Sequence, residues 1–473
     1  MVTAYATAAS TQHVVNPIAR LDRLRTTRHH LLWILLLGLG CFLETFDNMV
    51  FGYLAPSIRA QWGLSIAQVG VISSAAFPGM MIGALLGGRL SDQFGRKPTL
   101  VGATVLYSAA SLLCALAPTT GVLFVGRFLT GIGVQATICT VLVYTSEMFP
   151  RLSRGRFFTT LIFCAAVAIP VTGFTAAAIA PSSAGAWRWV FALGSTGLVI
   201  AIAIAVLLPE TVRWLTMNNR ENEGEAIVEK LEEQDRRRGE LAPVLPIPAE
   251  VKHGTFRELF KPRYAKRLVV FTLAFSGSCF AQYGFQAWVP TILVGSGMSH
   301  SLALHTASVI SLGTLLGSPA LFFVSDRIER KTAILLGALL TGGAYAAFAL
   351  ANNPTAVIIS GAIAFMGLTA LVTSFYNIIP EVFPTEVRGV ATGVVNGVCR
   401  LAGIASSLVG ASMYENLGTG PMFLILGASV ALAGTLVFVF GPRTTGCSLE
   451  HISAEPPEAM TCAIGHPPHV ERR

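Results

Sequence analysis

Apolar residues fall in twelve stretches of about twenty residues or more, separated by shorter polar segments. A helix of that length crosses a hydrocarbon core of roughly 30 Å. The expected spans are 31–56, 66–90, 98–117, 122–147, 156–180, 187–208, 267–292, 302–325, 332–351, 355–380, 388–413 and 418–441. The strands of a membrane barrel would be shorter and would alternate between apolar and polar positions. The pattern therefore predicts an all-α membrane protein with twelve transmembrane helices.

The two groups of six spans read as copies of one unit. Residues 92–97 are Asp-Gln-Phe-Gly-Arg-Lys, and residues 326–331, 234 positions further on, are Asp-Arg-Ile-Glu-Arg-Lys. The same offset relates three further pairs of identical residues: Glu147 and Glu381, Pro150 and Pro384, and Arg154 and Arg388. A register kept over such a length indicates an internal repeat. Features found in both halves then belong to the scaffold or gate, and features found in one half are candidates for the specific function.

The long polar interruption between the sixth and seventh spans divides the chain. We expect an N-terminal segment (1–30), a first six-helix bundle (31–208), a linker (209–266), a second six-helix bundle (267–441) and a tail (442–473). Within the linker, residues 221–240 have a charged, helix-like pattern. Residues 256–264 are expected to lie along the membrane surface, and the proline-bearing tail is expected to be disordered.

The placement of basic residues along the chain indicates the membrane topology. The net charge of +8 could indicate a nucleic-acid partner. However, apart from Arg127 and Arg400 inside spans, only Arg59 and Arg188 lie on loops after odd-numbered spans. This is the positive-inside bias, which places both termini and the linker in the cytoplasm. We therefore expect a bilayer-embedded monomer in a bacterial inner membrane, with no nucleic-acid partner.

Composition offers no catalytic or metal site. Only 12% of residues are charged, and the eight cysteines have no metal-like spacing. HExxH and GxSxG patterns do not occur. We expect neither an enzyme nor a cofactor or metal.

Charged residues recur at the cytoplasmic ends of the spans in both halves. An Asp at a helix end, followed four residues later by Arg, can form ionic contacts with a neighbouring helix end. We interpret the recurring groups as a breakable gate rather than a substrate site. Its members are Asp92, Arg96, Glu147, Arg154, Asp326, Arg330, Glu381 and Arg388. Glu147 is expected to pair with Arg154 and Arg156.

These motifs, taken together, resemble the major facilitator superfamily. They are the Gly88–Lys97 loop, Arg127-Phe-Leu-Thr-Gly-Ile-Gly133, the E-x-F-P-x-x-x-R-G segments at 147–155 and 381–389, and Pro209–Leu215. The resemblance implies two bundles that rock around a central cavity reached from one side at a time. Glu44-Thr-Phe-Asp47 is similar to patterns of the aromatic acid:proton and metabolite:proton symporters. Residues 282–288 lack the Asn and paired Tyr that sugar porters carry.

Four charges inside the spans have no counterpart in the other half. Glu44 corresponds to Ser278, Asp47 to Ala281, Arg127 to Gly361 and Arg400 to Ala166. Such charges cost a few kcal/mol each at a helix centre and are usually functional. Asp47 and Arg127 can lie at the same depth in the membrane. A neighbouring Arg favours the ionised form of a carboxylate, and separation of the two charges favours its protonated form. We expect Asp47, Arg127 and, as a relay, Glu44 to couple transport to protons.

The substrate site is expected around Arg400, about 18 Å from the cytoplasmic end of its helix. A guanidinium can hold a carboxylate with two parallel hydrogen bonds; the alternative is a structural ion pair with Glu44. Neutral contacts would come from Gln282, Tyr283, Gln286, Tyr376 and Asn377. We therefore expect proton-driven uptake of a small organic acid, with aromatic or heteroaromatic carboxylates first. A sugar or neutral-metabolite importer and a transporter-like sensor remain alternatives.

Overall fold

The computed structural model describes residues 17–244, 259, 261–317, 319 and 328–442. The described chain is almost entirely helical. The first half contains α1 (Pro17–Asp22), α2 (Arg28–Trp62), α3 (Ile66–Ser74), α4 (Ala76–Phe94), α5 (Arg96–Ala115), α6 (Thr120–Met148), α7 (Arg154–Ile179), α8 (Trp187–Gly194) and α9 (Gly197–Leu207). The linker contributes α10 (Val212–Met217) and α11 (Glu221–Arg236). The second half contains α12 (Pro262–Gly295), α13 (His300–Ser311), α15 (Arg330–Leu350), α16 (Pro354–Val382), α17 (Thr385–Leu417) and α18 (Thr419–Phe440).

The fold class predicted from the apolar pattern is confirmed. Eleven spans in the described ranges are long and apolar enough to cross a membrane; α3 with α4 form one of them, and α8 with α9 another. The expected span 302–325 begins within α13, and part of it lies outside the described residues. The linker helix α11 lies within residues 221–240, where the charged pattern predicted a helix. Of the expected surface segment 256–264, residues 256–258 and 260 lie outside the described residues, and residues 262–264 form the start of α12. The tail 442–473 lies outside the described residues except for residue 442.

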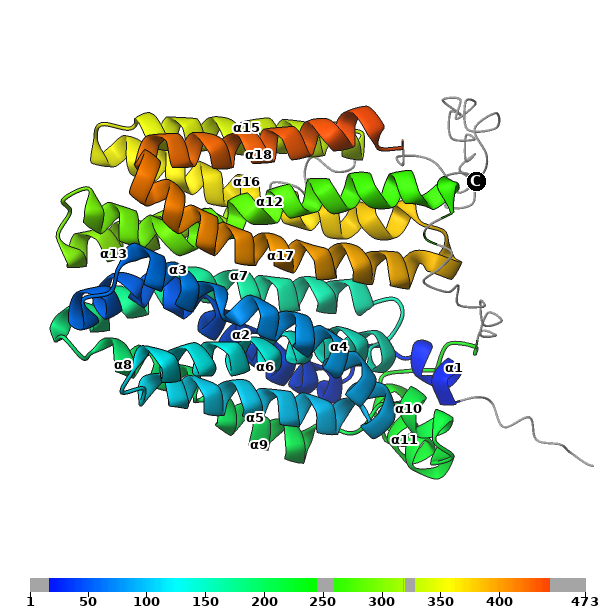
Figure 1. The fold of residues 1–473 in the computed structure, drawn as a ribbon. Coiled ribbons are helices and arrows are strands. Elements are labelled where there is room, and N and C mark those ends of the chain that lie inside the picture. Colours follow the sequence, from blue (N-terminus) through cyan, green and yellow to red (C-terminus); the bar gives the residue numbers. More distant parts are fainter. Residues whose placement is uncertain (1–16, 245–258, 260, 318, 320–327, 443–473) are drawn as a thin grey trace, which may run out of the picture.

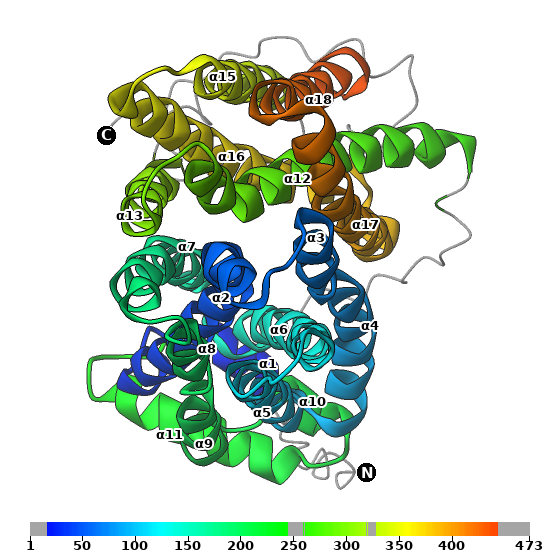
Figure 2. The same ribbon diagram turned by 60° about the vertical axis from the view of Figure 1, so that its left-hand side comes forward.

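The spans run side by side as two groups, one built from α2 to α9 and the other from α12 to α18 (Figure 1). Helices α1, α10 and α11 lie together at one end of the first group, here called the linker end (Figure 1). The groups meet where α2 contacts α12, α7 contacts α13, and α3 and α4 contact α17. Figure 2 shows α7 beside α13 and α3 beside α17.

Glycines allow the same close helix packing in each half. A Cβ atom at Gly79 or Gly83 of α4 would collide with the backbone of α6. At the repeat-related Gly313 and Gly317, a Cβ atom would collide with the backbone of α16. Small residues let helices approach closely in lipid, where dispersion rather than the hydrophobic effect drives packing. The repeat inferred from the charged motifs therefore extends to the helix interfaces.

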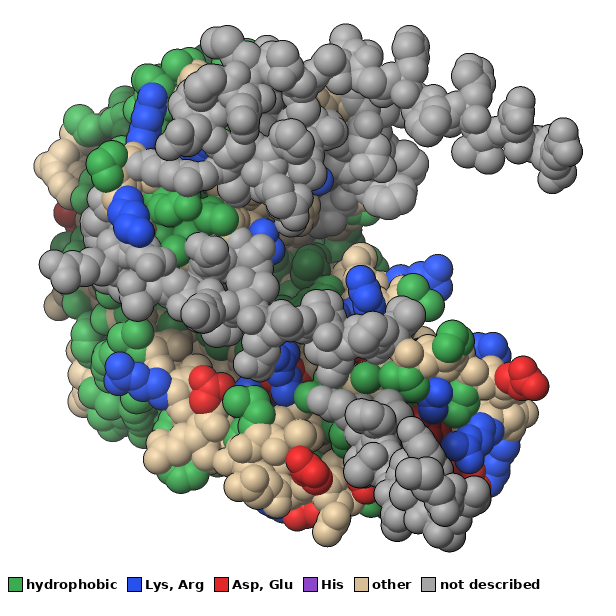
Figure 3. Space-filling model, turned by 90° about the vertical axis from the view of Figure 1, so that its right-hand side faces the viewer, with side chains coloured by type: hydrophobic (Ala, Val, Ile, Leu, Met, Phe, Trp, Pro, Cys, Tyr) green, Lys and Arg blue, Asp and Glu red, His purple; other side chains and the backbone are tan. Residues whose placement is uncertain are grey.

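Contacts between the halves gather at the end opposite the linker end. Phe77 packs edge-on against Tyr283, with ring centroids 4.7 Å apart, and its ring fills the space beside Gly403 of α17. Further out, Ser57 Oγ lies 2.7 Å from His300 Nε2. At the linker end, the ion pairs formed by described residues stay within one half. Figure 3, which looks onto that end, shows the surface hollowed between the halves.

Candidate functional site

Asp47 is fully buried inside the first half. Its Oδ1 atom accepts a hydrogen bond from Ser111 Oγ of α5, whereas Oδ2 has no hydrogen-bond partner among the described residues. Ser111 Oγ also lies 2.9 Å from the carbonyl oxygen of Phe191 in α8. A carbonyl oxygen can only accept, and a hydroxyl carries one proton. Ser111 can therefore donate to an ionised Asp47, or donate to Phe191 and accept from a protonated Asp47.

Arg127 of α6 separates Asp47 from the space between the halves. Its Nη1 atom donates to the carbonyl oxygen of Asp47 at 3.0 Å and lies 3.9 Å from Asp47 Oδ2. Its Nη2 atom reaches the carbonyl oxygen of Asn48 at 3.4 Å, and its guanidinium lies 5.7 Å from the Phe51 ring centre. Arg127 and Asn48 line the cavity between the halves, but Asp47 does not.

The second half has an equivalent contact between α12 and α15, but without a carboxylate. Tyr345, which corresponds to Ser111, donates its hydroxyl proton to the carbonyl oxygen of Ala281 at 3.1 Å. Ala281 corresponds to Asp47. Sequence reasoning missed Ser111 because the comparison between the halves considered only charged residues. The signal that could have found it is the difference between Ser111 and Tyr345 at equivalent positions of the two halves.

Arg400 and Tyr283 form the polar contact expected around the substrate site. Arg400 Nη1 donates to the Tyr283 hydroxyl at 2.5 Å. In the described part of the chain, Arg400 makes no ion pair within 4.0 Å, so the alternative pairing with Glu44 does not form. Glu44 is instead buried, with Thr45 Oγ1 donating to its Oε2 atom at 3.2 Å. Arg400 therefore forms no direct ion pair with a described carboxylate, although Glu44 lies close enough to interact with it electrostatically.

The remaining predicted substrate residues are only partly brought together. Tyr283 and Gln286 line the cavity between the halves together with Phe77, which sequence reasoning missed, but Gln282 does not line it. This cavity has a volume of about 40 Å³, well below the 300–1,000 Å³ of typical ligand sites. Tyr376 is 47% exposed and packs edge-on against Phe275 of α12, and its neighbour Asn377 is also exposed.

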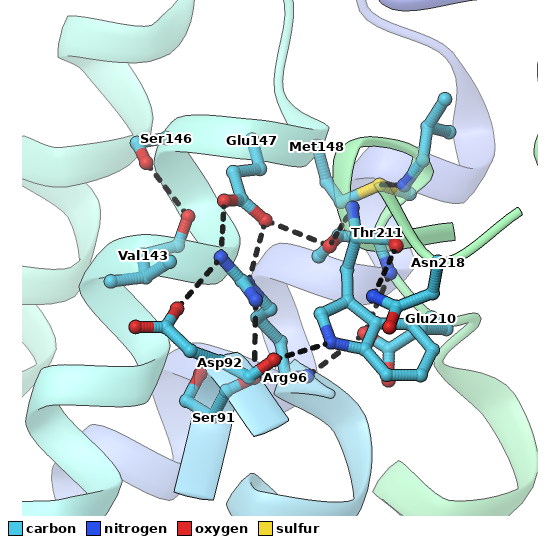
Figure 4. Close-up of polar contacts among 12 residues, drawn as sticks. Ser91, Asp92, Arg96, Val143, Ser146, Glu147, Met148, Glu210, Thr211 and Asn218 are labelled. Atoms are coloured by element: carbon cyan, nitrogen blue, oxygen red, sulfur yellow. Dashed lines mark hydrogen bonds and ion pairs between the residues drawn. The ribbon is translucent and has the colours of Figure 1, made fainter. Parts of the chain in front are cut away.

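The gate residues at the linker end form a compact network in the first half (Figure 4). Arg96 binds Glu147 through two hydrogen bonds of 2.9 and 3.0 Å. Asp92 lies 3.2 Å from Arg96, and its side chain is 78% exposed. Thr211 donates to Glu147 at 2.7 Å, and Trp214 donates to the carbonyl oxygen of Asp92 at 2.9 Å.

Glu210, which sequence reasoning did not include in the gate, completes this network. Its carboxylate accepts from the backbone N–H groups of Arg96 and Lys97 at the start of α5. Burial raises the pKa of Glu210 above its ordinary value, and these hydrogen bonds oppose the rise. Gly95, at φ 107°, lets the backbone turn so close to this carboxylate that a Cβ atom would not fit.

The second half repeats the central contacts of the gate. Arg330 pairs with Glu381 as Arg96 pairs with Glu147. Arg388 Nε donates to the carbonyl oxygen of Phe383 at 3.3 Å, as Arg154 donates to that of Phe149 at 3.2 Å. The expected pairing of Glu147 with Arg154 is wrong: Arg154 binds Asp22 at 2.8 Å instead. Arg96 lies directly across from Glu147, whereas the chain turns at Phe149 and Pro150 and carries Arg154 away. Asp326 lies outside the described residues.

Known proteins with similar sequences are transporters. The putative metabolite transport protein YyaJ of Bacillus subtilis is 31% identical over 433 residues, which cover 91% of this chain and 96% of the relative. The niacin transporter NiaP of Acinetobacter baylyi is 26% identical over 92% of this chain and 99% of its own length. The gentisate transporter of Corynebacterium glutamicum is 27% identical over 85% of this chain and 86% of its own length.

The fold is shared with the xylose transporter XylE of E. coli. Its partially occluded inward-open structure superimposes with a TM-score of 0.70 over 88% of this chain and 98% of XylE, at 19% identity. The profile of the family described as "Sugar (and other) transporter" matches residues 39–455. The chain therefore belongs to the sugar (and other) transporter family and is a multi-pass membrane transporter with the major facilitator fold.

Proposed function

We propose that the chain is a proton-coupled symporter that takes up a small aromatic or heteroaromatic carboxylate. The observation that carries this proposal is Arg400, a guanidinium within a span that forms no ion pair within 4.0 Å with any described carboxylate. A charge within a span is costly unless it is paired, and a substrate carboxylate would supply that pair. Tyr283, Phe77 and Tyr376 offer aromatic surfaces for the rest of the molecule.

The similar proteins support the same substrate class. Niacin and gentisate, the substrates named for two of them, are both ring compounds with a carboxylate. The small volume of the cavity means that the substrate must occupy more space than this conformation offers between Phe77 and Gln286. The exposed Tyr376 and Asn377 suggest that the site continues toward the linker end.

Proton coupling is proposed at Asp47. An ionised Asp47 accepts from Ser111 and lies beside Arg127. On protonation, the hydroxyl of Ser111 turns to Phe191, and Asp47 donates to Ser111. The attraction between Arg127 and Asp47 is then lost, which frees the guanidinium to move at the cavity wall. Glu44, buried on the same helix, is proposed as the relay between Asp47 and the linker end.

Alternating access is proposed through the two ends of the molecule. The linker end faces the cytoplasm of a bacterial cell, in agreement with the positive-inside bias. The end opposite the linker end is then the outer end, and this conformation is closed there by Phe77, Tyr283 and Gly403. The repeated gate residues would form contacts between the halves when the linker end closes.

Counterflow in proteoliposomes tests the proposal. Vesicles loaded with an unlabelled aromatic carboxylate should exchange it for labelled external substrate, and an imposed inward proton gradient should drive accumulation. Xylose in place of the acid serves as the neutral comparison. Exchange of xylose without exchange of the acid would establish the sugar importer instead, and binding without exchange of any solute would establish the sensor.

A further inference from the structure

A second cavity, of about 330 Å³, lies at the linker end on the outside of the first half. It is bordered by the start of α2, the start of α5, the end of α9 and the linker helix α11. Its lining residues include His29, Trp33, Lys97, Val206, Pro209 and Lys230. The cavity is much larger than the one between the halves and shares no lining residue with it.

The charged groups around this cavity are cationic. Lys97 and Lys230 make no ion pair within 4.0 Å with any residue that the structure describes. The nearby carboxylate of Glu210 is already bound to the N–H groups of Arg96 and Lys97. Glu229, beside Lys230 on α11, does not line the cavity. Two lysine side chains with three donors each are therefore available to an anion.

The rest of the lining is apolar and continues onto the membrane-facing surface. Val206 is 73% exposed, and Ile202 and Val199, one and two turns earlier on α9, are both 66% exposed. These three residues form a stripe that leads from the cavity along a transmembrane helix. His29 stacks on Trp33 at the cavity rim, with ring centroids 6.0 Å apart. Acyl chains of the bilayer lie along this stripe, so a lipid whose head group enters the cavity would keep its chains on α9.

We propose that this cavity binds the head group of an anionic phospholipid, with the phosphate between Lys97 and Lys230 and the acyl chains along α9. On the proposed topology the lipid comes from the cytoplasmic leaflet. Basic side chains near that surface attract anionic lipids, each contributing roughly fivefold in affinity. Among the residues that the structure describes, the second half does not repeat this site. Lys331, which corresponds to Lys97, lies 4.0 Å from Glu329 and 5.5 Å from the Phe438 ring centre instead.

Native mass spectrometry of the full-length protein with phosphatidylglycerol tests the site. Wild type and Lys331→Gln should retain phosphatidylglycerol equally. The variant Lys97→Gln/Lys230→Gln should bind it roughly twenty- to thirtyfold more weakly. If the double variant does not fold, Lys230→Gln alone, a change on the exposed face of α11, should weaken binding roughly fivefold.

Three results would overturn the proposal. The first is equal binding of phosphatidylglycerol by wild type and the double variant. The second is equal retention of phosphatidylcholine, whose head group carries no net charge, by wild type. The third is displacement of phosphatidylglycerol by millimolar inorganic phosphate, which would reassign the cavity to a soluble anion. Because every readout is lipid binding, these results are independent of the transported substrate.

Discussion

At the scale of single residues, the functional proposal depends on two side chains that the repeat does not duplicate, Arg400 and Asp47. Arg400→Gln removes the charge but keeps a hydrogen-bond donor. Because a truncated charged partner costs about 2–5 kcal/mol of binding, the affinity for an aromatic carboxylate should fall at least about thirtyfold. Thermal shift with a titrated acid measures the loss, since a bound ligand stabilises the folded protein.

Tyr283→Phe provides the matched control for Arg400. It keeps the ring that packs on Phe77 and removes only the hydroxyl that accepts from Arg400. The loss of this one hydrogen bond to a charged group should cost at most about 3 kcal/mol of binding free energy. Wild-type affinity in Arg400→Gln, or equal binding of the acid and its amide, would rule out the assignment.

Asp47→Asn should separate exchange from accumulation. Asparagine has nearly the shape of a protonated aspartate but cannot release a proton. Uptake against a substrate gradient should therefore disappear, while exchange across an equilibrated membrane persists. Proteoliposomes with and without a pH gradient distinguish the two. Retained uphill uptake would move the proton to another carboxylate, with Glu44 next.

Ser111 gives a finer test of the same step. Ser111→Ala removes the hydroxyl that stabilises ionised Asp47, so protonation should occur at higher pH. The pH dependence of uptake should move upward, and Arg127→Ala should move it in the same direction. Ser111→Thr keeps the hydroxyl and should leave the profile near that of wild type. An unchanged profile in Ser111→Ala would remove Ser111 from the coupling step.

At the scale of elements, α11 binds the N-terminal helix α1 through the buried carboxylate of Glu232. Glu232 accepts from Arg20 at 2.9 Å and from Arg23 at 2.6 Å. Although burial raises the pKa of Glu232, these hydrogen bonds outweigh it, and the net pKa lies below the usual value. The contact is therefore stabilising at neutral pH and is lost as pH falls below about 4.

Glu232→Gln should release α1 from α11. The loss of hydrogen bonds to charged groups should cost about 1.5–3 kcal/mol, and trypsin should cleave after Arg20 and Arg23 at least about tenfold faster at neutral pH. The adjacent Glu233→Gln breaks only the exposed pair with Arg237, which is worth less than about 1 kcal/mol. Equal cleavage of both variants would show that Glu232 does not hold α1.

Elements were the easiest part to predict from the sequence, because each span needs a long apolar run regardless of its neighbours. The positions of α2, α6 and α16 followed from that requirement alone. Pairing at helix ends was harder. Glu147 binds Arg96 across a helix interface rather than Arg154 on its own side of the chain, and sequence spacing carries no information about which helix ends lie opposite.

At the scale of the whole molecule, closure at the outer end depends on the fit of Phe77 against Gly403. A methyl group at position 403 has no room beside this ring. Gly403→Ala should therefore favour the outward-facing conformation, with faster labelling of a cysteine introduced near Ser57. Gly397→Ala, on the same helix with open space around its Cβ position, is the control. Unchanged labelling in Gly403→Ala would exclude this contact as the closure.

The central site shows the limit of sequence reasoning at this scale. Charged residues private to one half identified Asp47, Arg127 and Arg400 because a charge within a span is too costly to be incidental. Uncharged residues such as Ser111, Asn48 and Phe77 carry no such cost. Their roles depend on the three-dimensional crossing of α2, α5 and α6 and on the meeting of the two halves.

The proposed loading of one carboxylate, Asp47, also bears on the energy source of transport. One carboxylate loads at most one proton per cycle, and a monoanionic acid held by Arg400 would bring one negative charge with it. The cargo would then cross with no net charge. Membrane voltage acts only on net charge, at about 2.3 kcal/mol per charge for each 100 mV. Accumulation of such an acid would follow the pH difference alone, whereas a neutral sugar moved with the same proton would respond to voltage as well.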